Sequence, residues 1–250
     1  MLHMSTITST ATSTDGRLAL RLGRRGELET RGQVPIAARA VRGRPGWVHV
    51  VLVQTSAGPL GGDRIEVDVQ VEAGASLQLT ATAATLAYPA SEHASVSFNC
   101  RIGDGGRLAW LAEPVILAAG CDLVSSVEID LAERAAAVVR ETIVLGRHGE
   151  RAGRYRGTIR CDLGGRPLLR DHVRIVGTDP TTALLAMGDA RVLSTLALLG
   201  VRPDVDARPD EFDLEREGRL LRVLADDTAK AAARRAQAER LYMAALGRGR

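Results

Sequence analysis

The stretch RIEVDVQVEAGASLQLT, residues 64–80, decides the fold. Its first half alternates polar side chains with the apolar side chains of Ile65, Val67, Val69 and Val71, the pattern of a β-strand with one face in the core. The EAGAS that follows is short and contains glycine, as a tight reversal requires, and apolar residues return directly after it. The stretch therefore predicts a strand, a turn and a second strand.

The same unit recurs along the chain. In five places an apolar residue at a strand end is followed six residues later by another apolar residue: Val41 and Trp47, Val71 and Leu77, Ile102 and Leu108, Leu131 and Ala137, Leu163 and Leu169. The units start 30, 31, 29 and 32 residues apart. A period near 30 predicts stacked β units, each burying its apolar face against the next, with an unrelated β-sandwich as the alternative. We expect an all-β-dominated protein whose stacked-sheet, β-helix-like core consists of repeated strand-turn-strand units.

The last third of the chain has a different pattern. Residues 203–217 contain seven acidic residues against two arginines and predict an exposed acidic connection. A C-terminal α-helix is predicted at about 226–246, opened by two aspartates and carrying a narrow apolar stripe formed by Leu224, Ala231, Ala238, Leu241 and Ala245. The stretch 181–200 fits either a helix or a strand, and we expect a strand at about 190–199. The domain organisation is then a disordered tail at 1–15 and one domain at 16–250, with its β core at about 16–200.

Composition excludes several classes of function. The 250 residues carry a net charge of +3, and aromatic residues make up 3% of the chain. This favours neither a nucleic-acid groove nor base-stacking platforms. Lys230 is the only lysine and follows no glycine-rich loop, which makes a P-loop NTPase or a Schiff-base enzyme a poor fit. The arginine-rich stretch 147–174 is interpreted as a solvated strand face with some arginines available to a partner protein.

The cysteines and the N-terminus indicate the compartment. Cys100, Cys121 and Cys161 show no metal-binding spacing, and Cys100 and Cys161 fall on apolar strand faces, where we expect core packing. The sequence up to Asp15 lacks the charged and apolar regions of a secretory signal, and no apolar run is long enough for a transmembrane helix. We expect a cytoplasmic protein that binds neither membranes nor nucleic acid.

No enzyme template fits the sequence. The Gly-rich GPLGGDR at 58–64 precedes a strand rather than opening a helix, which favours a backbone turn over phosphate binding. Ser56 lacks the GxSxG frame of a nucleophile elbow. A hydrolase with a dispersed Ser/His/Asp set stays open as an alternative, and so does a β-solenoid interaction scaffold of another pathway.

Several motifs in order resemble the urease accessory protein family UreD, called UreH in some organisms. AGPLGGDRIEVDVQVEAGASLQLTATAATLAY, residues 57–88, resembles the family's signature of a Gly-Gly and Gly-Asp turn, an alternating strand and a Thr-rich strand ending in tyrosine. LAEPVILAAGCDL at 111–123, TIVLGRHGERAGRYRG at 142–157 and LLRVLADDT at 220–228 resemble later family elements. The motif positions are Gly61, Gly62, Asp63, Tyr88, Pro114, Gly146 and Arg147.

The resemblance implies a scaffold with no catalytic residues. Family members bind apo-urease and the accessory protein UreF, which recruits the GTPase UreG, and the assembly delivers nickel to the urease active site. The resemblance also implies an internal polar passage for the metal, so nickel would be in transit and no cofactor stably bound. Our candidates for this conduit are Asp63, Glu113 and Glu150, since carboxylate oxygens hold a divalent ion loosely enough for release. Turn capping by Asp63 and an Arg147–Glu150 ion pair are the structural alternatives.

Overall fold

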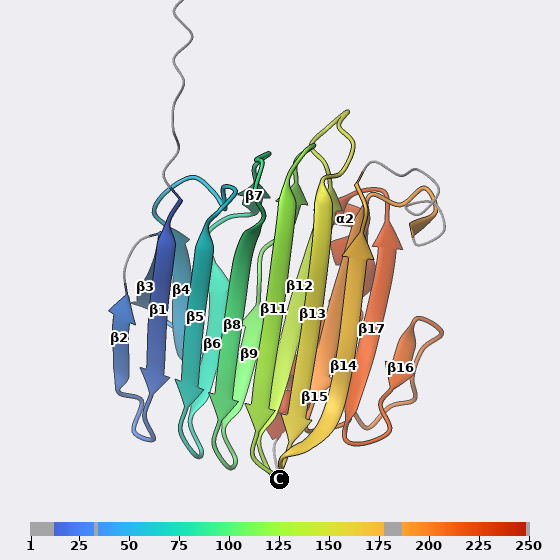
Figure 1. The fold of residues 1–250 in the computed structure, drawn as a ribbon. Coiled ribbons are helices and arrows are strands. Elements are labelled where there is room, and N and C mark those ends of the chain that lie inside the picture. The colour runs from blue at the N-terminus through green and yellow to red at the C-terminus, as the bar shows by residue number, and fades with distance from the viewer. Residues whose placement is uncertain (1–12, 33–34, 178–186, 249–250) are drawn as a thin grey trace, which may run out of the picture.

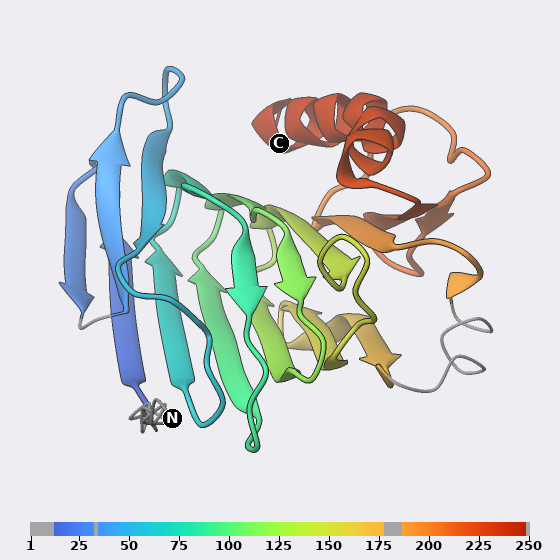
Figure 2. The same ribbon diagram turned by 90° about the horizontal axis from the view of Figure 1, so that it is seen from above.

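The computed structural model describes residues 13–32, 35–177 and 187–248. Within these ranges two β-sheets lie face to face, and the helix α2 covers part of the outer face of the second sheet (Figures 1 and 2). The predicted tail at 1–15 falls largely outside the described residues, as does 181–186 of the ambiguous stretch.

The first sheet has seven strands in the order β14-β13-β11-β8-β5-β1-β2. Their bounds, in chain order, are β1 Asp15–Leu22, β2 Leu28–Gly32, β5 Arg64–Val71, β8 Ala94–Ile102, β11 Asp122–Leu131, β13 Arg154–Leu163 and β14 Arg166–Ile175. The strands β1, β5, β8, β11 and β13 are parallel, and β2 and β14 close the two edges by antiparallel pairing.

The second sheet follows the order β16-β17-β15-β12-β9-β6-β4-β3, and the short strands β7 and β10 branch from β12. The bounds are β3 Ile36–Val41, β4 Val48–Gln54, β6 Ser76–Ala81, β7 Thr85–Ala87, β9 Arg107–Leu111, β10 Val115–Leu117, β12 Ala136–Leu145, β15 Val192–Leu199, β16 Glu211–Asp213 and β17 Gly218–Ala225. The chain alternates between the sheets from β4 to β13, which confirms the stacked, β-helix-like fold expected from the sequence.

The spacing found in the sequence is visible as the register of this stack. In the first sheet Val71, Ile102, Leu131 and Leu163 lie side by side, and in the second sheet Leu77, Leu108 and Ala137 do so. Three turns of four residues each, 72–75, 103–106 and 132–135, join the sheets at the lower end in Figure 1. Backbone hydrogen bonds connect each turn to the neighbouring coil, for example from Gly74 N to Asp104 O at 3.0 Å and from Ala136 N to Gly106 O at 3.1 Å.

The first and last of the five predicted units are hairpins within one sheet. Val41 and Trp47 lie at the turn between the antiparallel strands β3 and β4, both in the second sheet. After Leu163, the two-residue turn Gly164–Gly165, with φ of +58° and +72°, reverses the chain into β14. At each end of the stack the last strand therefore pairs with the strand next to it in the sequence, within the same sheet. The residue spacing alone does not distinguish such a hairpin from a turn that leads to the other sheet.

The main core fills the space between the two sheets with Val, Leu, Ile and Ala. Cys100 and Cys161 belong to it and are 2% and 0% exposed, which confirms their predicted packing role. A second cluster lies between α2 and the second sheet, and a third lies near β7, β10 and the start of β13.

The predicted strand at 190–199 is confirmed as β15, whose eight residues are all buried. The helix α2 spans Thr228–Arg248, slightly later than predicted, because 218–225 pairs with β15 as a strand. The helix begins behind Asp227, whose Oδ1 accepts a hydrogen bond from Lys230 N at 2.8 Å. Leu224 therefore belongs to β17 and is 36% exposed, which corrects its place on the helix stripe.

The buried face of α2 differs in part from the predicted stripe. Ala231, Ala238 and Ala245 are buried as expected, and Arg235, Tyr242 and Leu246 join them. The acidic connection is mostly exposed but contains β16, where Glu211 is buried beside Arg219 of β17. A sequence reading based on acidity alone misses this strand, because its buried carboxylate has a buried arginine as counter-charge.

Candidate functional site

Four loops return the chain from the second sheet to the first at the upper end of the stack in Figure 1. They span 55–63, 82–93, 112–121 and 146–153, and the second and third contain β7 and β10. Backbone hydrogen bonds join neighbouring loops, including Tyr88 N to Pro59 O at 3.1 Å and Thr85 N to Pro114 O at 2.8 Å. All residues singled out by the motifs lie on these loops: Gly61, Gly62, Asp63, Tyr88, Glu113, Pro114, Gly146, Arg147 and Glu150.

Asp63 is the buried anchor of the first loop, at 3% exposure. Its Oδ1 accepts a hydrogen bond from Thr14 N at 2.7 Å, and its Oδ2 accepts one from Leu60 N at 2.8 Å. Gly62 before it has a φ of +85°, which confirms the predicted backbone turn. Asp63 thus ties the segment before β1 to the loop before β5, and both carboxylate oxygens are engaged by backbone N–H groups.

Glu150 and Arg147 form an ion pair within the fourth loop. Arg147 Nε donates to Glu150 Oε2 at 2.8 Å, and this arginine holds the pKa of the Glu150 carboxyl down at about 2. Gly146 begins the loop with a φ of +75°, and a Cβ at this position would lie 2.7 Å from Glu150 O. The loop is therefore a tight turn with the carboxylate held on its surface by the arginine.

A cavity of about 210 Å³ lies between the two sheets next to these loops. Apolar side chains from both sheets line most of it, including Leu52, Trp110 and Val139 from the second sheet and Ile65, Phe98 and Val127 from the first. Glu113 also lines it, with Oε1 3.4 Å from Arg140 Nη2. Of the three predicted conduit carboxylates, Glu113 is the one among the cavity residues.

Glu141 of β12 is a second carboxylate on the cavity wall, and sequence reasoning missed it. Its Oε1 accepts a hydrogen bond from the hydroxyl of Tyr155 at 2.7 Å. Burial raises the pKa of the Glu141 carboxyl, and the Tyr155 hydrogen bond counteracts part of that rise. The sequence signal that could have indicated this carboxylate is the polar run Arg140-Glu141-Thr142 inside an otherwise apolar strand.

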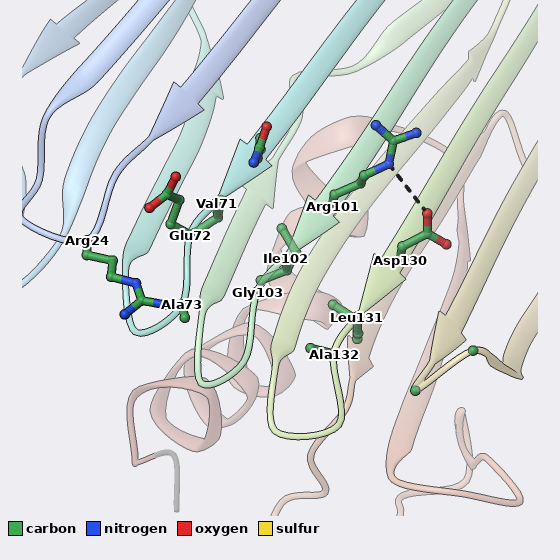
Figure 3. Close-up of a pocket in the computed structure, with 13 residues that line it drawn as sticks. Arg24, Val71, Glu72, Ala73, Arg101, Ile102, Gly103, Asp130, Leu131 and Ala132 are labelled. Atoms are coloured by element: carbon green, nitrogen blue, oxygen red, sulfur yellow. Dashed lines mark ion pairs between the residues drawn. The ribbon is translucent and has the colours of Figure 1, made fainter.

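A wider depression of about 600 Å³ lies on the outer face of the first sheet, at the four-residue turns (Figure 3). Arg101 of β8 and Asp130 of the adjacent strand β11 form an ion pair there, at 3.9 Å, and both side chains are more than two-thirds exposed. The two charges compensate each other and are screened by solvent, so this pair offers a ligand little electrostatic attraction. The cavity between the sheets is therefore the better candidate for a site.

Within the described residues no group of three or more His, Cys, Asp or Glu side chains is arranged to hold a metal ion. The carboxylates near the cavity, Glu113 and Glu141, would offer a divalent ion separate oxygen ligands rather than a closed coordination shell. In the same part of the chain, no helix is long and apolar enough to cross a membrane.

Comparison with known proteins adds the identity of the family. The profile described as UreD urease accessory protein matches residues 14–249. The urease accessory protein UreD of Streptomyces coelicolor is 34% identical over 200 residues, covering 79% of each chain. UreD of Streptomyces avermitilis is 34% identical over 206 residues, covering 77% of this chain and 80% of that protein.

A further relative, urease accessory protein UreD 2 of Saccharopolyspora erythraea, is 36% identical over 172 residues, which cover 68% of this chain and 58% of the relative. These relatives are all named as accessory proteins of urease. The chain belongs to the UreD family, as the sequence motifs indicated.

Proposed function

We propose that this chain is a non-catalytic scaffold for urease maturation. It binds apo-urease and a UreF-type accessory protein, and through the latter a UreG-type GTPase, and it assists GTP-dependent insertion of nickel into the urease active site. The match to the UreD family over residues 14–249 carries this proposal, because it includes the stacked loops and both sheets around the cavity. The proposal places the protein in the cytoplasm, where urease assembly would occur, and gives it no stably bound cofactor.

The cavity between the sheets is our proposed route for nickel in transit. Glu113 and Glu141 present carboxylate oxygens there, and oxygen ligands in small number hold a divalent ion weakly. The rest of the wall is mostly apolar and adds neutral side-chain oxygens, among them those of Gln54 and Ser125, and the guanidinium of Arg140 beside Glu113. Weak, sparse ligation suits passage better than storage.

Asp63 and Glu150 remain predicted positions on the nickel route. Their hydrogen bonds, however, favour a role in holding the conformation of the loops. The oxygens of Asp63 are occupied by backbone N–H groups and those of Glu150 by Arg147. We infer that any contact of theirs with nickel requires these bonds to open. Glu141 and Glu113 need less rearrangement, since both already line the cavity and, among the described residues, their Oε1 atoms alone are engaged there, by Tyr155 and Arg140 respectively.

The test is co-expression of the tagged chain with the urease structural subunits and the UreF-type protein of its host. Affinity capture, identification of the co-purifying chains and nickel analysis of the urease follow. We expect a complex that contains apo-urease and the UreF-type protein. Recovery of the chain alone, soluble and monomeric, would contradict the scaffold proposal and favour an interaction scaffold of another pathway.

The conduit is tested in the same system with Glu113→Gln and Glu141→Gln, which keep side-chain size. We expect an intact complex and less nickel in the urease. Glu29→Gln is the matched control, because Glu29 is exposed on β2, at the opposite edge of the first sheet from β14. If Asp63→Ala and Glu150→Ala both leave urease activation and complex formation at the wild-type level, those two residues are removed from the route.

A further inference from the structure

The outer face of β13 and β14 carries arginines directly opposite one another. The register pairs Arg156 with Arg174 and Arg160 with Arg170. All four side chains are exposed, at the edge of the first sheet where β14 is the last strand (Figure 1). Like charges directly opposite each other on an antiparallel pair destabilise it, so the fold itself gains nothing from this arrangement.

The neighbouring carboxylates compensate only part of this charge. Asp122 lies 3.2 Å from an Arg156 guanidinium nitrogen, Glu128 lies 3.9 Å from Arg160, and Asp162 pairs with Arg170. The two strands together expose six arginines: Arg154, Arg156, Arg160, Arg166, Arg170 and Arg174. The edge therefore has a surplus of positive charge.

The rest of the same face is balanced. Arg17 lies against Glu66 and Asp68, and Arg21 lies against Glu29 and Glu72, so each of these arginines faces two carboxylates. The surplus is thus a local property of β13 and β14 and not of the sheet.

Protection of an exposed edge strand does not explain the surplus. Charged side chains keep edge strands from pairing with other molecules, but alternating signs would do so without repulsion between neighbours. Arginine is moreover the residue that binds carboxylates in a bidentate manner. The like-charged pairs are better explained by a negatively charged partner that lies across them.

A protein partner fits better than a nucleic acid. Carboxylates stand among the arginines and would repel a phosphate backbone, and the aromatic residue of these two fully described strands, Tyr155, is buried. We propose that the outer face of β13 and β14 is a docking surface for a carboxylate-rich protein surface of the urease assembly. The choice of partner rests on the proposed function.

The test uses the double variant R156Q/R174Q in the co-expression capture described above. The control is R64Q/R101Q, which removes two exposed arginines from β5 and β8 on the same face. We expect R156Q/R174Q to reduce the captured urease assembly about tenfold, and the control to change it little. Capture by the wild-type chain should weaken as NaCl rises above about 0.15 M, where the screening length is about 8 Å, toward about 1 M, where it is about 3 Å.

Thermal unfolding separates docking from a structural role. Removal of two like charges should leave the melting temperature of R156Q/R174Q unchanged or raise it. The proposal is overturned if capture is unchanged, or if capture falls together with the melting temperature. It is also overturned if size-exclusion light scattering shows that these arginines hold a dimer of this chain, or if they are required to bind a DNA duplex.

The two proposals fail in different ways. If the wild-type chain captures no urease chain, the proposed function fails and the partner assigned to this surface fails with it. If the wild-type chain captures the assembly and R156Q/R174Q does so equally well, only the docking surface is refuted.

Discussion

Glu239→Ala in α2 should destabilise the protein strongly, because this carboxylate lies between two nearly buried arginines. Its Oε2 accepts a hydrogen bond from Arg235 Nε at 2.9 Å, and its Oε1 lies 3.2 Å from Arg140 Nη1 on β12. The Arg235 and Arg140 side chains are 10% and 13% exposed. The Arg140 pair joins the helix to β12, the strand that carries Glu141, and the Arg235 pair lies within the helix.

The size of the loss in the free energy of unfolding depends on the hydrogen-bond partners that each arginine keeps in Glu239→Ala. Loss of one partner from a buried ion pair costs about 3–5 kcal/mol. Arg235 still donates to Ser194 Oγ at 2.7 Å, and Arg140 still donates to the carbonyl of Ala112 at 3.0 Å. The lower end, about 3 kcal/mol, therefore applies, and a chain of this length should lose about 6–12 °C in melting temperature.

The assay is thermal unfolding followed by circular dichroism, with Glu239→Gln and Lys230→Ala as comparison variants. The glutamine keeps an acceptor and should fall between wild type and Glu239→Ala. Lys230 of the same helix makes an exposed ion pair with Asp226, which precedes the helix, so its loss should change the melting temperature by about 1–2 °C at most. A Glu239→Ala melting temperature as close to wild type as that of Lys230→Ala would refute the reasoning.

Three further outcomes are expected. Gly103→Ala would place a Cβ 2.7 Å from the backbone nitrogen of Ala73 in the neighbouring turn, so it should lower the free energy of unfolding in urea by about 1–3 kcal/mol. A variant as stable as the wild type would contradict the close packing of the turns. Burial raises the pKa of the Cys100 and Cys161 thiols to about 12, so neither should react with a thiol reagent in the native protein at about pH 8; rapid native modification would argue against the packed core. The Arg219 hydrogen bond lowers the pKa of Asp213, so its stabilisation is present above about pH 4 and decreases as the pH falls through the folded-state pKa. Because the Asp213 side chain is 41% exposed, solvent screening leaves Asp213→Asn a cost of about 0.5 kcal/mol at neutral pH and a smaller cost in acid, and a pH-independent difference would count against it.

The alternating strands could be predicted from the sequence because one face of each meets the core and the other meets water. β5 and β13 show this clearly, with buried and more exposed residues in strict alternation. β15 was harder to assign, since the core lies on one side and α2 packs against the other, so all its residues are buried. A strand covered on both faces has no alternation to read.

The candidate site was only partly predictable. The loop residues could be found because glycine, proline and aspartate mark turns, and the stack gathers successive loops at one end. Glu141 could not be assigned to the cavity, because its neighbours Arg140 and Thr142 are polar too. The sequence alone does not tell which side chain of such a run faces inward and which faces α2.

The two ends of the stack should differ in their tolerance of insertions. The turns at 72–75, 103–106 and 132–135 have equal length, and backbone hydrogen bonds connect each of them to the neighbouring coil, so an inserted residue in one would break these bonds. The loops at the opposite end differ in length from one coil to the next, and an insertion there need not displace a strand. Evolution can therefore reshape the loop end for new partners while the turn end keeps every coil in register.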